Sequence, residues 1–237
     1  MKHIRKIIAL VLCTALACLS LSALAEDGIT VNGKGETYIS ADTVYVTLGV
    51  QISHENVREA QNTVNERIKA IREALIAMGI PKEDINTDQL NIYMYTEYTD
   101  GAERNVYHVS SMLTVRSEDI TAAGNIIDTA FAEGANTLNG VQFAANDTAE
   151  AENEAIRLAV ADARRKAEVI AEAAGLKITG IEHVSEGYVS SYDSGINNYG
   201  VMYESAKEEV VAATEVQAAK LCVSAQVTVV YETKDRD

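Results

Sequence analysis

The segment DTVYVTLGVQIS, residues 42–53, decides the fold class, because its apolar side chains alternate strictly with other residues. This period of two indicates a half-buried strand of an antiparallel sheet. A shorter alternating run at about residues 29–36 precedes it, so the two neighbouring β-runs predict a hairpin. The face expected to be buried in the second run carries Val44, Val46, Leu48, Val50 and Ile52.

Three helices are predicted, at about residues 55–78, 119–132 and 147–174. The first has an apolar stripe at three- and four-residue steps and ends at Gly79, a left-handed C-cap, before Ile80 and Pro81. The third begins with Asp147 as N-cap and Glu150 three residues later. Its expected buried stripe is narrow enough to let the helix lie close on a sheet, and consists of Ile156, Ala159, Ala163, Ala167 and Ile170.

The remaining strands complete an order of ββαββαβαββ. They are predicted at about residues 89–98, 105–116, 141–145, 176–185 and 219–231. A short polar connection is expected at 84–87. This order predicts an α+β fold with three helices packed on an antiparallel sheet or sheets. The two βα segments of the second half could instead contribute parallel neighbours.

Residues 186–214 lack clear periodicity and are predicted to form a long excursion before the last strand. Tyrosines lie there among Ser, Gly and Asn residues, a composition that suits recognition surfaces. The excursion is either an interaction surface or a disordered surface loop. If it is an interaction surface, the contact residues are expected to be Tyr188, Tyr192, Tyr199 and Tyr203.

Residues 1–25 are typical of a secretory signal peptide. Basic residues precede an apolar run at residues 7–19, and small residues predict cleavage at the Ala23 and Ala25 site. The alternatives are a retained membrane anchor and a lipoprotein modified at Cys18. The apolar run is short for a span of about 20 residues, and Cys18 has a poor lipobox. We therefore expect 26–237 to be one exported domain, periplasmic or secreted, without stable membrane insertion.

Charge and cysteine content restrict the partners. The net charge of −15 at pH 7 argues against nucleic acid and against anionic lipid, which both need basic surfaces. Cleavage would leave Cys222 as the one cysteine, so no intrachain disulfide is expected. Because Cys222 lies in an apolar strand pattern, a buried inert thiol is favoured over a reactive one.

No motif indicates catalysis, a metal or a cofactor. His54, His108 and His183 are far apart and lack metal-ligand spacing, and nucleophile motifs are missing. The Gly33-x-Gly35 pair lacks the spacing of a dinucleotide loop and is interpreted as a bulge or a close backbone approach. In the segment 162–166, ion pairs four residues apart favour a solvated face over an anion or subunit contact.

Several stretches together resemble the SIMPL-domain family of exported bacterial proteins, which includes the periplasmic immunogenic proteins. They are ITVNGKGE at 29–36, MGI at 78–80 with DINT at 84–87, NGVQF at 139–143, and the alanine-rich run at 155–176. The closing strand at 227–232 fits as well, so the resemblance covers nearly all of 26–237. The segment 215–220 departs from the pattern because it has neither Pro nor Gly.

The resemblance implies an exported α+β protein, with ring assembly in some members and links to envelope or oxidative stress in others. It implies no reaction, cofactor or catalytic residue. The leading hypothesis is a non-catalytic envelope protein that acts as a homo-oligomer, protective or scaffolding in stress. The alternative is a monomeric module that binds a small ligand or a protein through 186–214. An uncharacterised hydrolase is the third hypothesis.

Overall fold

The computed structural model describes residues 28–99, 101–193, 214, 216–218 and 220–236. The predicted leader, with Ala23 and Ala25, lies outside these residues. The chain divides into two compact units. The first comprises Met1–Gly33, Val160–Gly187 and Val227–Asp237, and the second comprises Lys34–Ala159 and Tyr188–Gln226.

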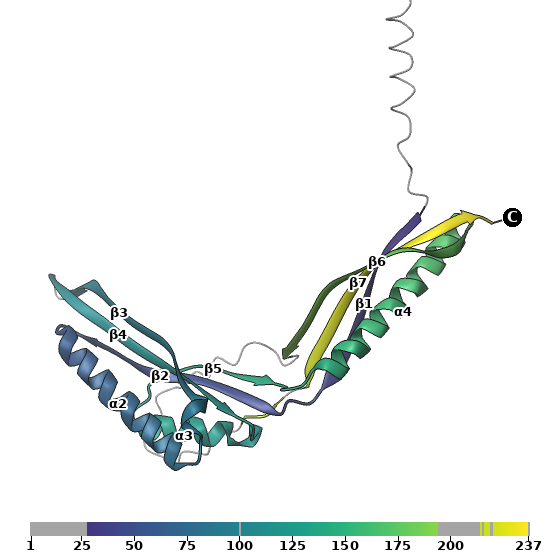
Figure 1. Cartoon of the computed structure of the whole chain (residues 1–237). Helices are drawn as coiled ribbons and strands as arrows, with labels where there is room; N and C mark the ends of the chain where they lie inside the picture. Colours follow the sequence, from purple (N-terminus) through teal and green to yellow (C-terminus); the bar gives the residue numbers. More distant parts are fainter. Residues whose placement is uncertain (1–27, 100, 194–213, 215, 219, 237) are drawn as a thin grey trace, which may run out of the picture. The chain divides into compact units, whose positions relative to one another are not determined.

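The second unit contains a four-stranded antiparallel sheet in the order β3-β4-β2-β5. Two helices cover one face of this sheet (Figure 1). The strands are β2 (Thr43–His54), β3 (Ile85–Thr99), β4 (Ala102–Ser117) and β5 (Thr137–Ala144), and the helices are α2 (Val57–Ala77) and α3 (Ala123–Ala132). Short 3-10 turns, η1 (Lys82–Asp84) and η2 (Ile120–Ala122), precede β3 and α3.

The alternation of β2 places its apolar face in the core, as predicted. Val44, Val46, Leu48 and Val50 are fully buried, and α2 and α3 pack against this face. Gly79 closes α2 with a φ of 105°, and the Ile80 amide donates to the Leu75 carbonyl oxygen at 3.1 Å. This is the predicted left-handed helix end.

A second antiparallel sheet has the order β1-β7-β6, and helix α4 lies along it (Figure 1). Its elements are β1 (Gly28–Ile39), β6 (Leu176–Asp193), β7 (Leu221–Asp235) and α4 (Ala149–Ala174). At Gly35 the strand β1 approaches α4 so closely that an added Cβ would lie 2.0 Å from the Ala155 carbonyl oxygen. The interpretation of this glycine as a close backbone approach is confirmed.

The buried stripe of α4 consists of alanines, and part of its prediction was wrong. Ile170 is 45% exposed and Ile156 is half-buried. The buried positions recur at every fourth residue, which is wider than the 3.6-residue period of a straight stripe. The contact line therefore winds around the helix, and isoleucines placed by a regular period fall outside it. The buried residues are Ala151, Ala155, Ala159, Ala163, Ala167 and Ala171.

Three other predictions are corrected by the pairing of strands. β1 and β2 belong to different sheets and form no hairpin; β1 instead neighbours β7, from the other end of the chain. Residues 85–87, expected in a polar connection, begin β3 because they pair with β4. β6 continues to Asp193, so 186–193, expected in the excursion, are strand. Residues 194–213 of the excursion lie outside the described residues.

The described residues before β7 are tied to α3. Asp128 accepts hydrogen bonds from the Thr214 amide at 3.1 Å and from its hydroxyl at 2.5 Å. Val216 and Ala218 pack on the core of the second unit. None of the helices that the structure describes combines the length and apolar composition needed to cross a bilayer.

Candidate functional site

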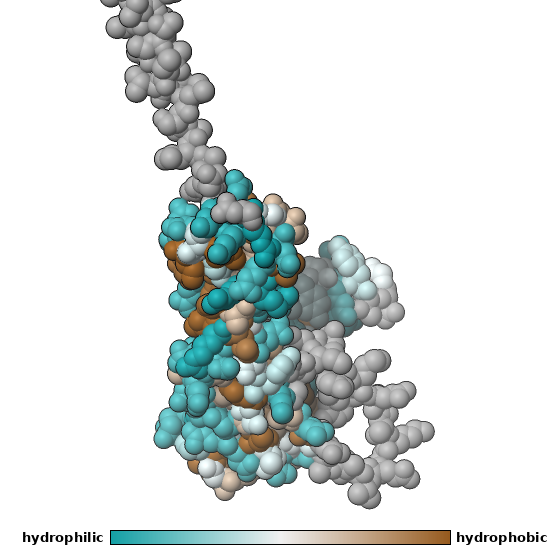
Figure 2. Space-filling model, turned by 90° about the vertical axis from the view of Figure 1, so that its right-hand side faces the viewer, coloured by the Kyte–Doolittle hydropathy of each residue, from teal (hydrophilic) through white to brown (hydrophobic). Residues whose placement is uncertain are grey.

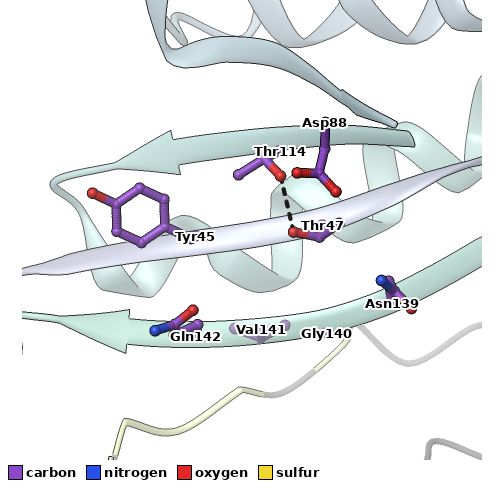
Figure 3. A pocket seen from close by; sticks show the side chains of 8 residues that line it. All are labelled: Tyr45, Thr47, Asp88, Thr114, Asn139, Gly140, Val141 and Gln142. Carbon is purple, nitrogen blue, oxygen red and sulfur yellow. Dashed lines mark hydrogen bonds between the residues drawn. The ribbon is translucent and has the colours of Figure 1, made fainter. Parts of the chain in front are cut away.

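The first candidate site is a groove of about 570 Å³ on the face of the four-stranded sheet that α2 and α3 do not cover. Its lining residues come from β2, β3, β4 and β5. Figure 3 shows the Asp88 carboxylate directed toward the pair Thr47–Thr114. These two hydroxyls are hydrogen bonded at 3.0 Å. The lining residues are Tyr45, Thr47, Asp88, Thr114, Asn139, Gly140, Val141 and Gln142.

Strand alternation and two irregularities place the polar side chains of this groove. Because Val46 faces the core, Tyr45 and Thr47 on either side of it face the groove. The pairing of β3 with β4 shifts between Thr87 and Gln89, and that of β2 with β5 shifts beside Thr47. Such bulges redirect side chains, and here they bring Asp88 and Asn139 to the groove.

Arg116 lies beside this groove, opposite Tyr45 in the β2–β4 register. Its guanidinium donates to Glu118 at 2.8 Å, to Asn146 at 3.2 Å and to Asp84 at 3.4 Å. The bond to Glu118 is the largest cause that raises the pKa of Arg116, and contacts with Tyr45 and Asp84 add to it. The charge of this arginine is thus already matched by two carboxylates.

The groove offers hydroxyl, amide and carboxylate groups on an open surface. These groups can donate and accept hydrogen bonds to a small polar ligand. Of the described residues, no three from His, Cys, Asp and Glu are grouped so that they could hold a metal ion. The expectation that the protein has no metal, no cofactor and no catalytic residue stays a prediction.

Two of the histidines come closer together than their sequence separation indicates. Ser53, next to His54 on β2, lies opposite His108 on β4, and its hydroxyl is 3.0 Å from His108 Nδ1. His108 also stacks against Tyr93 with ring centroids 4.9 Å apart. His54 has a different partner: its Nε2 atom lies 3.4 Å from Oε2 of Glu59. β-Pairing brings such residues together, and no local spacing could have predicted it.

The tyrosine-bearing excursion is described only at its start. Tyr188 lies near the end of β6 and is 75% exposed. Tyr192 is the penultimate residue of this strand. Tyr199 and Tyr203 lie outside the described residues. The predicted use of these four tyrosines as contact residues stays a prediction.

Cys222 and the charged segment 162–166 of α4 have structural roles within the fold. Cys222 is free and 2% exposed on β7, which confirms that it is buried. The predicted Asp162–Lys166 pair forms at 2.6 Å, and Lys166 also donates to the Asn32 carbonyl oxygen of β1 at 2.9 Å. The lysine therefore ties α4 to the sheet.

A second candidate site, which the sequence analysis missed, is the outer edge of β3. We call residues Gln89–Tyr95 of this strand the β3 edge. Leu90, Ile92 and Met94 point to one side of the sheet and are 57%, 44% and 52% exposed. Tyr93 and Tyr95, on the other side, are 54% and 38% exposed. Figure 2 views the molecule from the right-hand side of Figure 1 and does not display the β3 edge; on the face it shows, hydrophobic residues form separate spots among hydrophilic ones.

The signal for this edge was present in the sequence. Residues 89–96, QLNIYMYT, contain no charge, no Pro and no Gly. Such a segment has the composition of strands that associate with other strands. The sequence analysis placed the segment in a strand. Only the order of the strands in the sheet shows that it is an edge.

Comparisons with known proteins give relatives along most of the chain. The family model described as "SIMPL: Protein of unknown function (DUF541)" matches residues 29–231. A 26 kDa periplasmic immunogenic protein of Brucella melitensis is 29% identical over 181 residues, which cover 70% of this chain and 72% of that protein. The protein of the same description from Brucella abortus is also 29% identical, with the same coverage.

Proposed function

The chain belongs to the SIMPL family, and from that premise we propose that it is a non-catalytic, exported envelope protein that acts by self-association. The observation that carries the proposal is the β3 edge. It presents Leu90, Ile92 and Met94 to solvent, each more than two-fifths exposed, and no strand among the described residues pairs with the outer side of β3. An exposed, apolar edge strand is a template for pairing with another chain.

Export is supported by the amino-terminal sequence and by the relatives. Residues 1–25 have the pattern of a signal peptide. The two Brucella relatives are named as periplasmic. We propose that this chain also acts outside the cytoplasm, with a protective or scaffolding role under envelope or oxidative stress.

The test of self-association is the native mass of residues 26–237 by multi-angle light scattering over a range of concentrations. We expect a multimer in the wild type. Ile92→Lys should shift the mass toward the monomer, because it places a charge on the β3 edge. Val169→Lys is the matched control, since Val169 is a 59% exposed residue on α4. A wild type that is monomeric at all concentrations would refute the proposal.

A monomeric binding module is the second candidate function. The groove of about 570 Å³ beside Arg116 favours it, because its hydroxyl, amide and carboxylate groups suit a small polar ligand. The sequence analysis places the contact of such a module in residues 186–214. Deletion of 194–213 distinguishes the two contact sites. If ligand binding survives this deletion but is lost in Thr47→Val, the ligand binds in the groove.

A further inference from the structure

The β3 edge is suited to one particular partner. β3 lies at the end of the sheet order β3-β4-β2-β5, and β4 pairs with it along its whole length on the inner side. We propose that β3 pairs antiparallel with β3 of a second copy, about a two-fold axis at Ile92, so that two four-stranded sheets become one. This inference rests on the proposed self-association and specifies its contact.

Charge favours a second copy at this edge over the other edges of the chain. The net charge of −15 makes two copies repel each other, so they approach best where charges are absent. Residues 89–96 carry none. β6 and β1 are also edge strands, but β6 carries Lys177, Glu182 and Glu186. β1 carries Lys34 and Glu36. β5, at the other end of the four-stranded sheet, has only 8 residues.

The positions of the side chains select the register. A two-fold axis normal to the sheet keeps each face on its own side, so opposed residues must share a face. With Ile92 opposite itself, Leu90 faces Met94 of the partner, and apolar side chains oppose each other along that face. Opposed apolar pairs of this kind stabilise a sheet.

The neighbouring alignments that keep each face on its own side oppose apolar side chains to polar ones. An axis at Asn91 would set Met94 opposite the irregularity at Asp88, and an axis at Tyr93 would oppose Leu90 to Thr96. The register at Ile92 opposes Leu90, Ile92 and Met94 only to one another.

The structure also limits how far the pairing extends. Arg72 of α2 donates to the Ile85 carbonyl oxygen at 2.5 Å and to the Thr87 hydroxyl at 3.3 Å. The irregularity at Asp88 follows, and bulges end edge pairing. The free span is then the β3 edge, Gln89–Tyr95, which is about 24 Å long at the rise of an extended strand. In the Ile92 register this span pairs with itself from end to end.

Disulfide trapping tests this contact. Cys222 is buried, so a cysteine introduced at position 92 is the reactive thiol. In the proposed register Ile92→Cys meets itself at a Cα separation of about 4.5–5.5 Å, which a disulfide can span. Tyr93→Cys would meet its copy about two residues along the strand. We expect covalent dimers of Ile92→Cys to form about tenfold faster than those of Tyr93→Cys, because diagonal neighbours lie about 7–8 Å apart.

A mixing experiment gives an independent measure with different variants. Leu90→Cys alone, and Met94→Cys alone, should dimerise slowly, because each position faces the other. An equimolar mixture should form the disulfide heterodimer at a rate similar to that of Ile92→Cys. Wild type, with Cys222 alone, is the control for each reaction.

The outcomes separate this contact from self-association itself. If wild type assembles by light scattering but Tyr93→Cys or the single Leu90→Cys traps as fast as Ile92→Cys, the proposed register is wrong and self-association stands. If wild type assembles and none of these variants traps a dimer, the contact lies elsewhere. If wild type is monomeric, both proposals fall.

Discussion

The contact between Gly35 and α4 allows a stability prediction to be worked out in detail. In Gly35→Ala the new Cβ would lie 2.0 Å from the Ala155 carbonyl oxygen and 2.5 Å from the Ala159 nitrogen. Both neighbours are backbone atoms of a helix, so no side-chain rotation can make room. The helix and strand must separate for the alanine to fit.

The size of the effect follows from this separation. An ordinary contact begins at 3.4 Å, so the strand and the Ala155 carbonyl oxygen must move apart by about 1.4 Å. A gap of about 0.5–1 Å between neighbouring atoms already loses a quarter to a half of the dispersion energy of their contact. Overpacking costs about 1–3 kcal/mol, occasionally more. Because the buried alanine stripe of α4 shares the shift, we expect Gly35→Ala to lower the free energy of unfolding by about 3 kcal/mol.

The assay is urea denaturation followed by circular dichroism, with the slope of the transition measured for each variant. Gly140→Ala is the control, because an added Cβ there meets nothing within 4 Å, and we expect it to change stability by about 0.5 kcal/mol or less. Ala155→Gly should not rescue Gly35→Ala, since the clash is with the carbonyl and not the methyl group. A Gly35→Ala protein as stable as Gly140→Ala would refute the close approach.

Three further predictions concern other contacts. Asp128→Ala removes both hydrogen bonds to Thr214 and should lower the free energy of unfolding by about 2 kcal/mol in urea titrations, whereas an unchanged midpoint would show that the contact does not form. Cys222 should react with a thiol reagent only after unfolding, because it is 2% exposed; rapid labelling of the native protein would contradict its burial. Hydrogen bonds from Thr121 lower the pKa of Asp119 in the folded protein. Its carboxylate therefore stabilises the fold at pH values above the pKa of an unfolded Asp, about 4, and this contribution is lost as the pH falls toward the lower pKa of the folded state. Asp119→Asn should therefore lower the melting temperature at pH 7 and differ less from wild type below pH 4; a constant difference would exclude the linkage.

Much of the local structure could be predicted because its signals are local. The alternation around Val46 specifies a strand with one buried face. Gly79 and Pro81 specify the end of the first helix within one or two residues. The fold class and the order of the elements follow from such periods and end signals. The sequence predicted that small residues of α4 pack on a sheet. It wrongly included Ile156 and Ile170 in the buried stripe, because the path of the contact line around the helix depends on the sheet that the helix packs against.

The candidate sites could be predicted only in part, because each depends on which strands are neighbours. Thr47, Thr114 and Asn139 line one groove although they are dispersed along the chain. Asp88 reaches that groove through an irregularity in strand pairing. The sequence analysis named tyrosines in the excursion as contacts, whereas the described surface with the most continuous apolar exposure is the β3 edge.

Periodicity and short motifs specify the α+β class, the end of the first helix, the buried face of β2 and the resemblance to the family, so these features could be predicted from residue order alone. The pairing of β1 with β7 and not with β2 becomes visible only in the packed sheets, as does the position of β3 at an edge of the described sheet, next to β4. Backbone hydrogen bonds between strands are much the same whatever the side chains, so they do not by themselves select which strands pair. Their partners are selected by the burial of whole faces, which is settled only when both sheets and their helices pack.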